Sequence, residues 1–158
     1  MNKREGIVPM SYWRFAAMIA TGTVVMYGIM YMATYEFSHA TFSESRVYMA
    51  LAMGATMSIV MLAYMWGMYA GTGAKLGIFA TALVVLTAAV ALDRSQFLVE
   101  DVGFMSSMIP HHSIAITRSE RARISDPRVR DLAQQIIEAQ REEIAEMKAL
   151  IEDLNENP

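Results

Sequence analysis

The sequence contains no cysteine, which excludes disulfides, thiolate metal sites, iron–sulfur clusters and cysteine nucleophiles. It is also poor in charge: only 18% of its 158 residues are Asp, Glu, Lys or Arg, whereas 54% are hydrophobic. A soluble domain of this length would carry more charge, so the composition favours a membrane protein.

Charged residues are absent from three long stretches, at residues 15–35, 47–69 and 76–92. About 20 apolar residues suffice for a helix to cross a bilayer, and about 17 are still within the usual range. We therefore predict a membrane domain of residues 1–93 with three transmembrane helices. A cleaved signal peptide is the alternative for the first stretch, but the run is long and no small-residue cleavage site is evident.

The basic residues before position 93 are distributed unevenly between the predicted flanks. Lys3, Arg4 and Arg14 precede the first stretch and Lys75 precedes the third, whereas the loop of residues 36–46 holds one basic residue. Because Lys and Arg are retained in the cytoplasm, we expect a cytoplasmic N-terminus. Three crossings then place the C-terminal part outside, in the periplasm if the membrane is a bacterial inner membrane.

Residues 93–158 are acidic, with eight Lys or Arg against thirteen Asp or Glu. This charge balance, and the lack of any basic stripe with interleaved aromatics, argues against nucleic acid as a partner. We expect a water-facing domain of residues 94–158 with two helices, at about 96–123 and 127–154. Asp126 can cap the second helix, and Pro127 fits its first position.

The first of these two helices carries a set of metal-binding residue types. At about 100° per residue, Asp101, Met105, Met108 and His112 fall within roughly 60° of arc, with His111 beside them. Thioether and imidazole together suit copper(I). The alternative is that the methionines pack the core and the histidines are hydrogen-bonded or exposed.

Pro110 and the second helix bear on this motif. Proline removes a backbone donor, so a kink or a restart is expected beside the histidines. The second helix is predicted to place Gln140 and Glu143 on its apolar face, where they need partners that the histidines could supply. The apolar residues of that predicted face are Leu132, Ile136, Ala139, Met147, Leu150 and Leu154.

A methionine ladder runs through the second predicted span, at Met49, Met53, Met57, Met61 and Met65. Helical residues four apart are neighbours, so these side chains share one stripe. The ladder predicts helix packing, because Met fills irregular gaps and no charge or histidine accompanies it. A thioether track for copper(I) is the alternative.

Two sequence hallmarks resemble the family known as domain of unknown function 305. They are the run from Met108 to His112, which reads Met-Ile-Pro-His-His, and a later helix with Gln140, Glu143, Ile144 and Met147. The resemblance covers roughly residues 96–154. The charge-free leader followed by Arg94-Ser95-Gln96 and Ser113-Ile114-Ala115-Ile116 is similar to a membrane-anchored branch of the family.

The resemblance implies a ferritin-like helical bundle, and it implies copper, since some soluble members bind copper through Met and His in the periplasm. Many members supply four helices themselves, whereas this domain supplies two. We therefore expect a homo-oligomer in which paired hairpins complete a four-helix bundle.

The sequence thus predicts an all-α membrane protein with an extracytoplasmic helical hairpin that binds or handles copper without catalysis. No Ser-His-Asp set is visible, and paired Glu-x-x-His motifs are absent. The alternative is a structural or accessory subunit of a larger membrane complex, in which the two histidines only lock the hairpin. The candidate ligands are Met105, Met108, His111, His112 and Met147, and the groups expected to orient the imidazoles are Asp101, Gln140 and Glu143.

Overall fold

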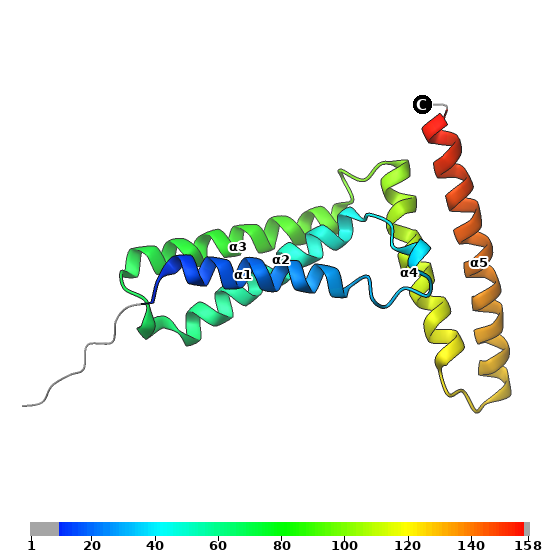
Figure 1. Cartoon of the computed structure of the whole chain (residues 1–158), viewed down its shortest axis with the longest axis horizontal. Coiled ribbons are helices and arrows are strands. Elements are labelled where there is room, and N and C mark those ends of the chain that lie inside the picture. Colours follow the sequence, from blue (N-terminus) through cyan, green and yellow to red (C-terminus); the bar gives the residue numbers. More distant parts are fainter. Residues whose placement is uncertain (1–9, 157–158) are drawn as a thin grey trace, which may run out of the picture. The chain divides into compact units, whose positions relative to one another are not determined.

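In a computed structural model, residues 10–156 are described, and within them lie five α-helices, two short 3-10 helices and no strand (Figure 1). The all-α prediction is confirmed. The chain divides into two compact units: one holds residues 47–95 and the chain before residue 28, and the other holds residues 28–46 and the chain after residue 95. Residues 28–46 therefore belong with the C-terminal hairpin, although the sequence placed them in the membrane domain.

The first unit contains three helices, α1 (Tyr12–Ile29), α2 (Glu44–Tyr64) and α3 (Thr72–Ser95), with the 3-10 helix η2 (Trp66–Met68) after α2. Two of them, α2 and α3, are long and apolar enough to cross a membrane. Three such helices were predicted, and the difference lies in α1. The charge-free run of residues 15–35 is not one helix, because α1 ends at Ile29 and the chain then turns, while its 18 residues include Arg14. The predicted basic flank at Lys3 and Arg4 lies outside the described residues.

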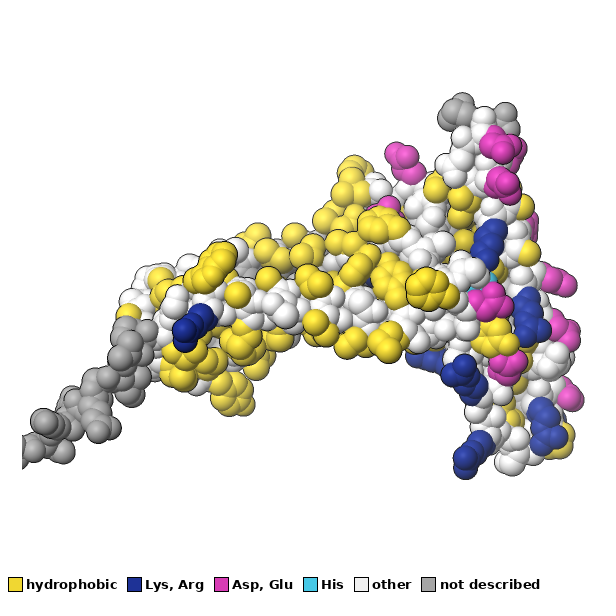
Figure 2. All heavy atoms as spheres, viewed as in Figure 1, with side chains coloured by type: hydrophobic (Ala, Val, Ile, Leu, Met, Phe, Trp, Pro, Cys, Tyr) yellow, Lys and Arg dark blue, Asp and Glu magenta, His cyan; other side chains and the backbone are white. Residues whose placement is uncertain are grey.

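Large apolar side chains cover the surface of this unit. Figure 2 shows hydrophobic side chains over α1, α2 and α3, whereas acidic and basic side chains gather on α4 and α5 of the other unit. On α3, Leu76, Leu83 and Val84 are each at least 58% exposed. Such a continuous apolar surface is costly in water and favourable against lipid.

The helices of the first unit are joined by an aromatic cluster and a close approach. Phe15, Leu62 and Tyr69 are buried together, and residues of α3 pack on them. Elsewhere α1 and α2 come so close that a β-carbon on Gly54 would collide with the Thr23 hydroxyl. Small residues permit this kind of approach between membrane helices.

The second unit is built on a hairpin of α4 (Asp101–Arg121) and α5 (Pro127–Glu156), with the 3-10 helix η1 (Phe37–His39) packed on α4. Its core consists of Ile109 and Ile116 from α4 and Ile137 and Ile144 from α5. The four isoleucines hold the two helices together along their length.

The buried face of α5 differs from the prediction. Ala133, Ile137 and Ile144 are buried, whereas Leu132, Leu150 and Leu154 of the predicted face are exposed. Helix α5 carries apolar residues over a broad arc, and the isoleucines of α4 determine which part of that arc is buried. Of the predicted face, Met147 does pack against the core.

The loop between the two helices follows the prediction. The Asp126 carboxylate accepts a hydrogen bond of 2.9 Å from the backbone N–H of Arg128, and α5 begins at Pro127. The Arg128 guanidinium also donates to this carboxylate and lowers the pKa of Asp126. The predicted cap is confirmed.

Helix α4 begins at Asp101, later than predicted, because α3 continues to Ser95 and Gln96 then adopts a positive φ of 52°. Of the kink or restart predicted at Pro110, the restart does not occur, because α4 runs through this residue. Its missing N–H leaves the Ser106 carbonyl without a helical donor, and the Thr41 hydroxyl donates to that oxygen at 2.6 Å. Thr41, from the segment 28–46, therefore satisfies the carbonyl that the proline leaves without a donor.

Candidate metal site in the helical hairpin

A pocket of about 470 Å³ opens between α4 and α5. Six of the eight residues that we predicted as metal ligands or as groups that orient ligands line this pocket. These are Asp101, Met105, Met108, His112, Glu143 and Met147. The helical spacing explains the α4 residues, since positions 101, 105, 108 and 112 share one face.

Three thioethers from two helices line this pocket. Met105 is buried, at 7% exposure, and Met108 and Met147 are half-buried. Met147 also packs on the isoleucine core, so α5 holds it against α4. The soft donors of the pocket are therefore held by the packing of the hairpin and are not carried on a loop.

His112 lies beside a pair of polar side chains on α5. Gln140 donates a hydrogen bond of 3.0 Å to the Glu143 carboxylate, and the same oxygen lies 2.9 Å from Nδ1 of His112. The His112 side chain is 14% exposed, and Nδ1 has no aligned hydrogen bond in spite of the short contact. With Nδ1 beside a carboxylate, Nε2 is the nitrogen that can bind a metal.

The structure does not bring His111 into the pocket. Its side chain is exposed, and its ring centroid lies 5.9 Å from that of His112. Gln140 is also outside the lining and reaches His112 only through Glu143.

The sequence reasoning missed two carboxylates in the lining, Glu146 and Asp153. Their signal was present, since they lie three residues after Glu143 and three after Leu150, near the same side of α5. Within residues 10–156, no three side chains of the His, Asp and Glu types come together as a metal site. A metal site in this pocket therefore depends on its methionines.

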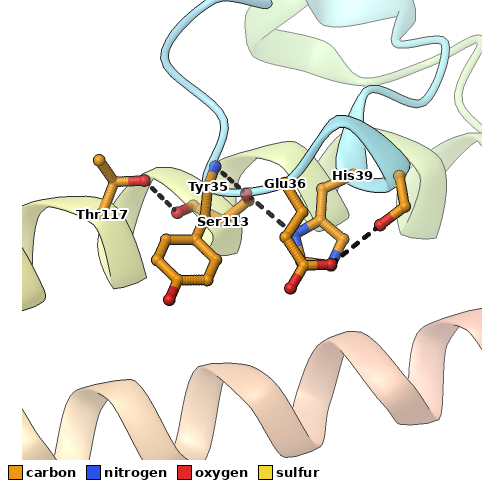
Figure 3. A network of polar contacts seen from close by, with 6 residues as sticks. Tyr35, Glu36, His39, Ser113 and Thr117 are labelled. Carbon is orange, nitrogen blue, oxygen red and sulfur yellow. Dashed lines mark hydrogen bonds and ion pairs between the residues drawn. The ribbon is translucent and has the colours of Figure 1, made fainter.

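A second polar cluster, centred on Ser113, fixes the segment 28–46 to α4 (Figure 3). The Ser113 hydroxyl accepts a hydrogen bond of 2.6 Å from the backbone N–H of Tyr35 and lies 3.0 Å from Nδ1 of His39. His39 is buried, and Glu36 lies 3.8 Å from its other ring nitrogen. The sequence reasoning did not predict this cluster. The only signals were a serine directly after the histidine pair of α4 and a histidine in a polar loop.

The surroundings of His39 disfavour its charged form. Burial lowers the pKa of His39, the positive charge of Lys148 on α5 lowers it further, and Glu36 opposes both effects. The imidazole is therefore a neutral hydrogen-bonding group at neutral pH.

Comparison with known proteins gives three results. The family model described as "Domain of unknown function (DUF305)" matches residues 101–158, which include the whole hairpin. The chain is similar to "Uncharacterized protein L153" of Acanthamoeba polyphaga mimivirus, with 34% identity over 108 residues that cover 67% of this chain and 69% of the relative. No solved structure matches the chain. The matched region includes both the Met-Ile-Pro-His-His helix and its partner helix, and the chain belongs to the DUF305 family.

Proposed function

We propose that this protein is an integral membrane protein whose hairpin binds copper(I). The observation that carries the proposal is the pocket between α4 and α5, where Met105, Met108 and Met147 meet His112. Thioether and imidazole ligands select copper(I) over hard cations. The proposed role is binding or handling of the ion, without catalysis.

The residues of the pocket fit this ion. Met105, Met108, Met147 and Nε2 of His112 would hold it, and bound copper(I) would supply a soft centre with a single positive charge. The negative charges of Asp101, Glu146 and Asp153 line the same pocket and would balance that charge. Glu143, supported by Gln140, lies 2.9 Å from Nδ1 and would orient the imidazole, as partners of metal-bound histidines do.

The membrane orientation is part of the proposal. Residues 28–46 and the hairpin form one compact unit, so both would lie on the same side of the membrane. Helices α2 and α3, which are long and apolar enough to cross, would be two crossings that return to that side. We propose that α1 is the third crossing. Its 18 residues extend about 27 Å, and Trp13, 80% exposed, suits a membrane interface. The distribution of basic residues then puts the hairpin outside the cytoplasm.

Self-association of the hairpin is the second part of the proposal. A two-helix hairpin buries little apolar surface, and Phe104, Leu132 and Leu150 are each at least 46% exposed. Pairing two hairpins by a two-fold axis would cover these side chains and complete a ferritin-like four-helix bundle. The mass of the protein in mild detergent tests this, and a folded monomer would contradict it.

The rival function is that of a structural or accessory subunit in a membrane complex. The contact between His112 and Glu143 favours it, because an ion pair across the hairpin would lock α4 to α5 without any metal. In that case, replacing the pocket methionines would change no metal affinity.

A copper(I) titration separates the two functions. The full chain in detergent competes with a chromophoric copper(I) chelator, and we compare His112→Ala, His111→Ala and the triple change of Met105, Met108 and Met147 to Leu. A matched control changes Met18, Met32 and Met68 to Leu, since these lie outside the pocket and are at least 40% exposed.

We expect the pocket triple variant and His112→Ala to bind at least about ten times more weakly than the control triple variant. Acid should also weaken binding, because a protonated imidazole cannot bind a metal. His111→Ala tests the one predicted ligand that lies outside the pocket. Equal affinity in the pocket and control variants would leave the accessory role as the better reading.

A further inference from the structure

The first unit, which contains α1, α2 and α3 and which we call the membrane unit, holds a second cluster of methionines. They line a groove of about 440 Å³. Five of the eight residues that line it are methionines. The lining consists of Met26, Met49, Ala52, Met53, Thr56, Met57, Val60 and Met61. The hairpin pocket shares none of these residues.

Two adjacent stripes of α2 form most of the groove. Met49, Met53, Met57 and Met61 recur every four residues and lie one above the other on the helix. The neighbouring stripe, at positions 52, 56 and 60, carries only the small or medium side chains Ala, Thr and Val. The long thioethers are therefore the walls of the groove, and the smaller residues leave it open.

Helix α1 brings a further thioether from the opposite side. A β-carbon on Gly22 would lie 2.7 Å from the methyl carbon of Met57 and 3.5 Å from its sulfur, so the tip of Met57 rests on α1 at this glycine. Met26 is one helical turn further along the same face of α1 and lines the groove as well. Thioethers from two helices thus converge on one region.

We propose that this groove binds one soft monovalent cation, copper(I) or its analogue silver(I), within the membrane unit. Among the lining residues, all in the described part of the chain, there is no charge and no histidine. The single side-chain oxygen in the lining, the Thr56 hydroxyl, is too little for a hard cation, which needs several oxygen donors. A charge in a membrane is costly, and only bonds from polarisable sulfur can offset that cost here. Met26, Met53 and Met57 are the central ligands, with Met49, 47% exposed, at the edge.

Met61 has a different role from the central three. It packs against the buried cluster of Phe15, Leu62 and Tyr69, so its side chain also fills space between helices. If the whole ladder served packing in this way, Met→Leu changes would leave ion binding untouched, because the two residues have similar volumes.

Thioethers do not titrate, so ion binding in the groove should not depend on pH, whereas binding in the hairpin pocket should, because of His112. We remove the hairpin site with His112→Ala and Leu at positions 105, 108 and 147, keep the full chain in detergent, and count bound silver(I) by equilibrium dialysis. The measurement is made at about pH 5.5 and about pH 7.5, on either side of the ordinary histidine pKa. We expect one silver ion per chain at both values.

Changing Met26, Met53 and Met57 to Leu in that background should remove this ion, whereas changing Met18, Met32 and Met68 should not. Circular dichroism checks that each variant keeps its helices. In the otherwise wild-type chain, the groove changes should lower the number of bound silver ions by one. No ion in the hairpin-deficient chain, or equal binding by groove and control variants, would overturn the proposal. Neither result depends on whether the hairpin binds copper.

Discussion

The Thr41 hydroxyl donates to the carbonyl oxygen of Ser106 at 2.6 Å and so replaces the hydrogen bond that Pro110 cannot make. The helix that carries the candidate ligands Met105, Met108 and His112 is therefore completed by a residue that lies 65 positions earlier in the sequence. A side chain in a loop thus satisfies the carbonyl that Pro110 leaves without a helical donor, within the helix of the proposed metal site.

Removing the Thr41 hydroxyl should destabilise the protein only as long as Pro110 is present. In Thr41→Val, the Ser106 carbonyl loses its donor, which costs about 1 kcal/mol and lowers the Tm by about 2–4 °C in a chain of this size. In a Pro110→Ala background the helix supplies its own N–H, and the Thr41 change should have little effect. Thermal unfolding of the four variants forms a double-mutant cycle. Equal losses in both backgrounds would contradict this account.

Acid should weaken the second unit through His39. Burial lowers the pKa of His39 in the folded chain below its ordinary value of 6.5, so the unfolded chain binds more protons as the pH falls below that value. Stability is therefore complete above about pH 6.5 and declines from there towards the lowered folded-state pKa. The Tm of metal-free protein, followed against pH, should decline less in His39→Gln than in wild type. The control is His111→Gln, at an exposed position, and an unchanged decline in His39→Gln would exclude His39 as the cause.

Glu143 should matter for metal affinity although it is not a candidate ligand. Its carboxylate lies 2.9 Å from Nδ1 of His112, and replacing such a partner commonly costs about ten-fold or more in affinity. We expect Glu143→Gln to weaken copper(I) binding by about ten-fold in the competition titration. Glu142→Gln, at the exposed neighbouring position, is the control and should bind as wild type does. If both variants bind alike, the imidazole is not oriented by this contact.

The absence of cysteine makes the membrane topology measurable by single-cysteine labelling. Phe37→Cys in the segment 28–46 and Gln135→Cys on α5 both lie at exposed positions of the second unit. An impermeant maleimide added to intact cells should label both, while Thr72→Cys, at the exposed first residue of α3, should react only after the membrane is opened. Labelling of Thr72→Cys in intact cells, with protection of the other two, would reverse the proposed orientation.

The hairpin could be predicted from the sequence because its signals are local. The spacing of Asp101, Met105, Met108 and His112 indicates one face of a helix. Asp126 before Pro127 indicates the start of a helix. The structure places these four side chains in one pocket and uses Asp126 as the cap. Which arc of α5 faces α4 was not predictable in this way, since both Ile136 and Ile137 are apolar and only the partner helix decides between them.

The attachment of residues 28–46 could not be predicted from local patterns. The hydrogen bonds that hold it, from Tyr35 to Ser113 and from Thr41 to Ser106, join residues 78 and 65 positions apart. The same limit affected α1, because a charge-free run such as residues 15–35 contains no polar signal for the turn after Ile29. Hydropathy reports which residues avoid water, and it does not report where a helix stops.

These long separations also determine the order in which the molecule can be completed during synthesis. Tyr35, His39 and Thr41 leave the ribosome before α2 and α3, and their partners on α4 follow only after both of those helices have been made. Until then the Tyr35 N–H and Nδ1 of His39 lack the Ser113 hydroxyl that they contact in the folded chain. Assembly therefore proceeds from α1, α2 and α3 to the hairpin, and contacts of such high sequence separation form slowly. A nascent chain that stops before residue 106 contains the segment 28–46 but neither of its partners on α4, Ser106 and Ser113.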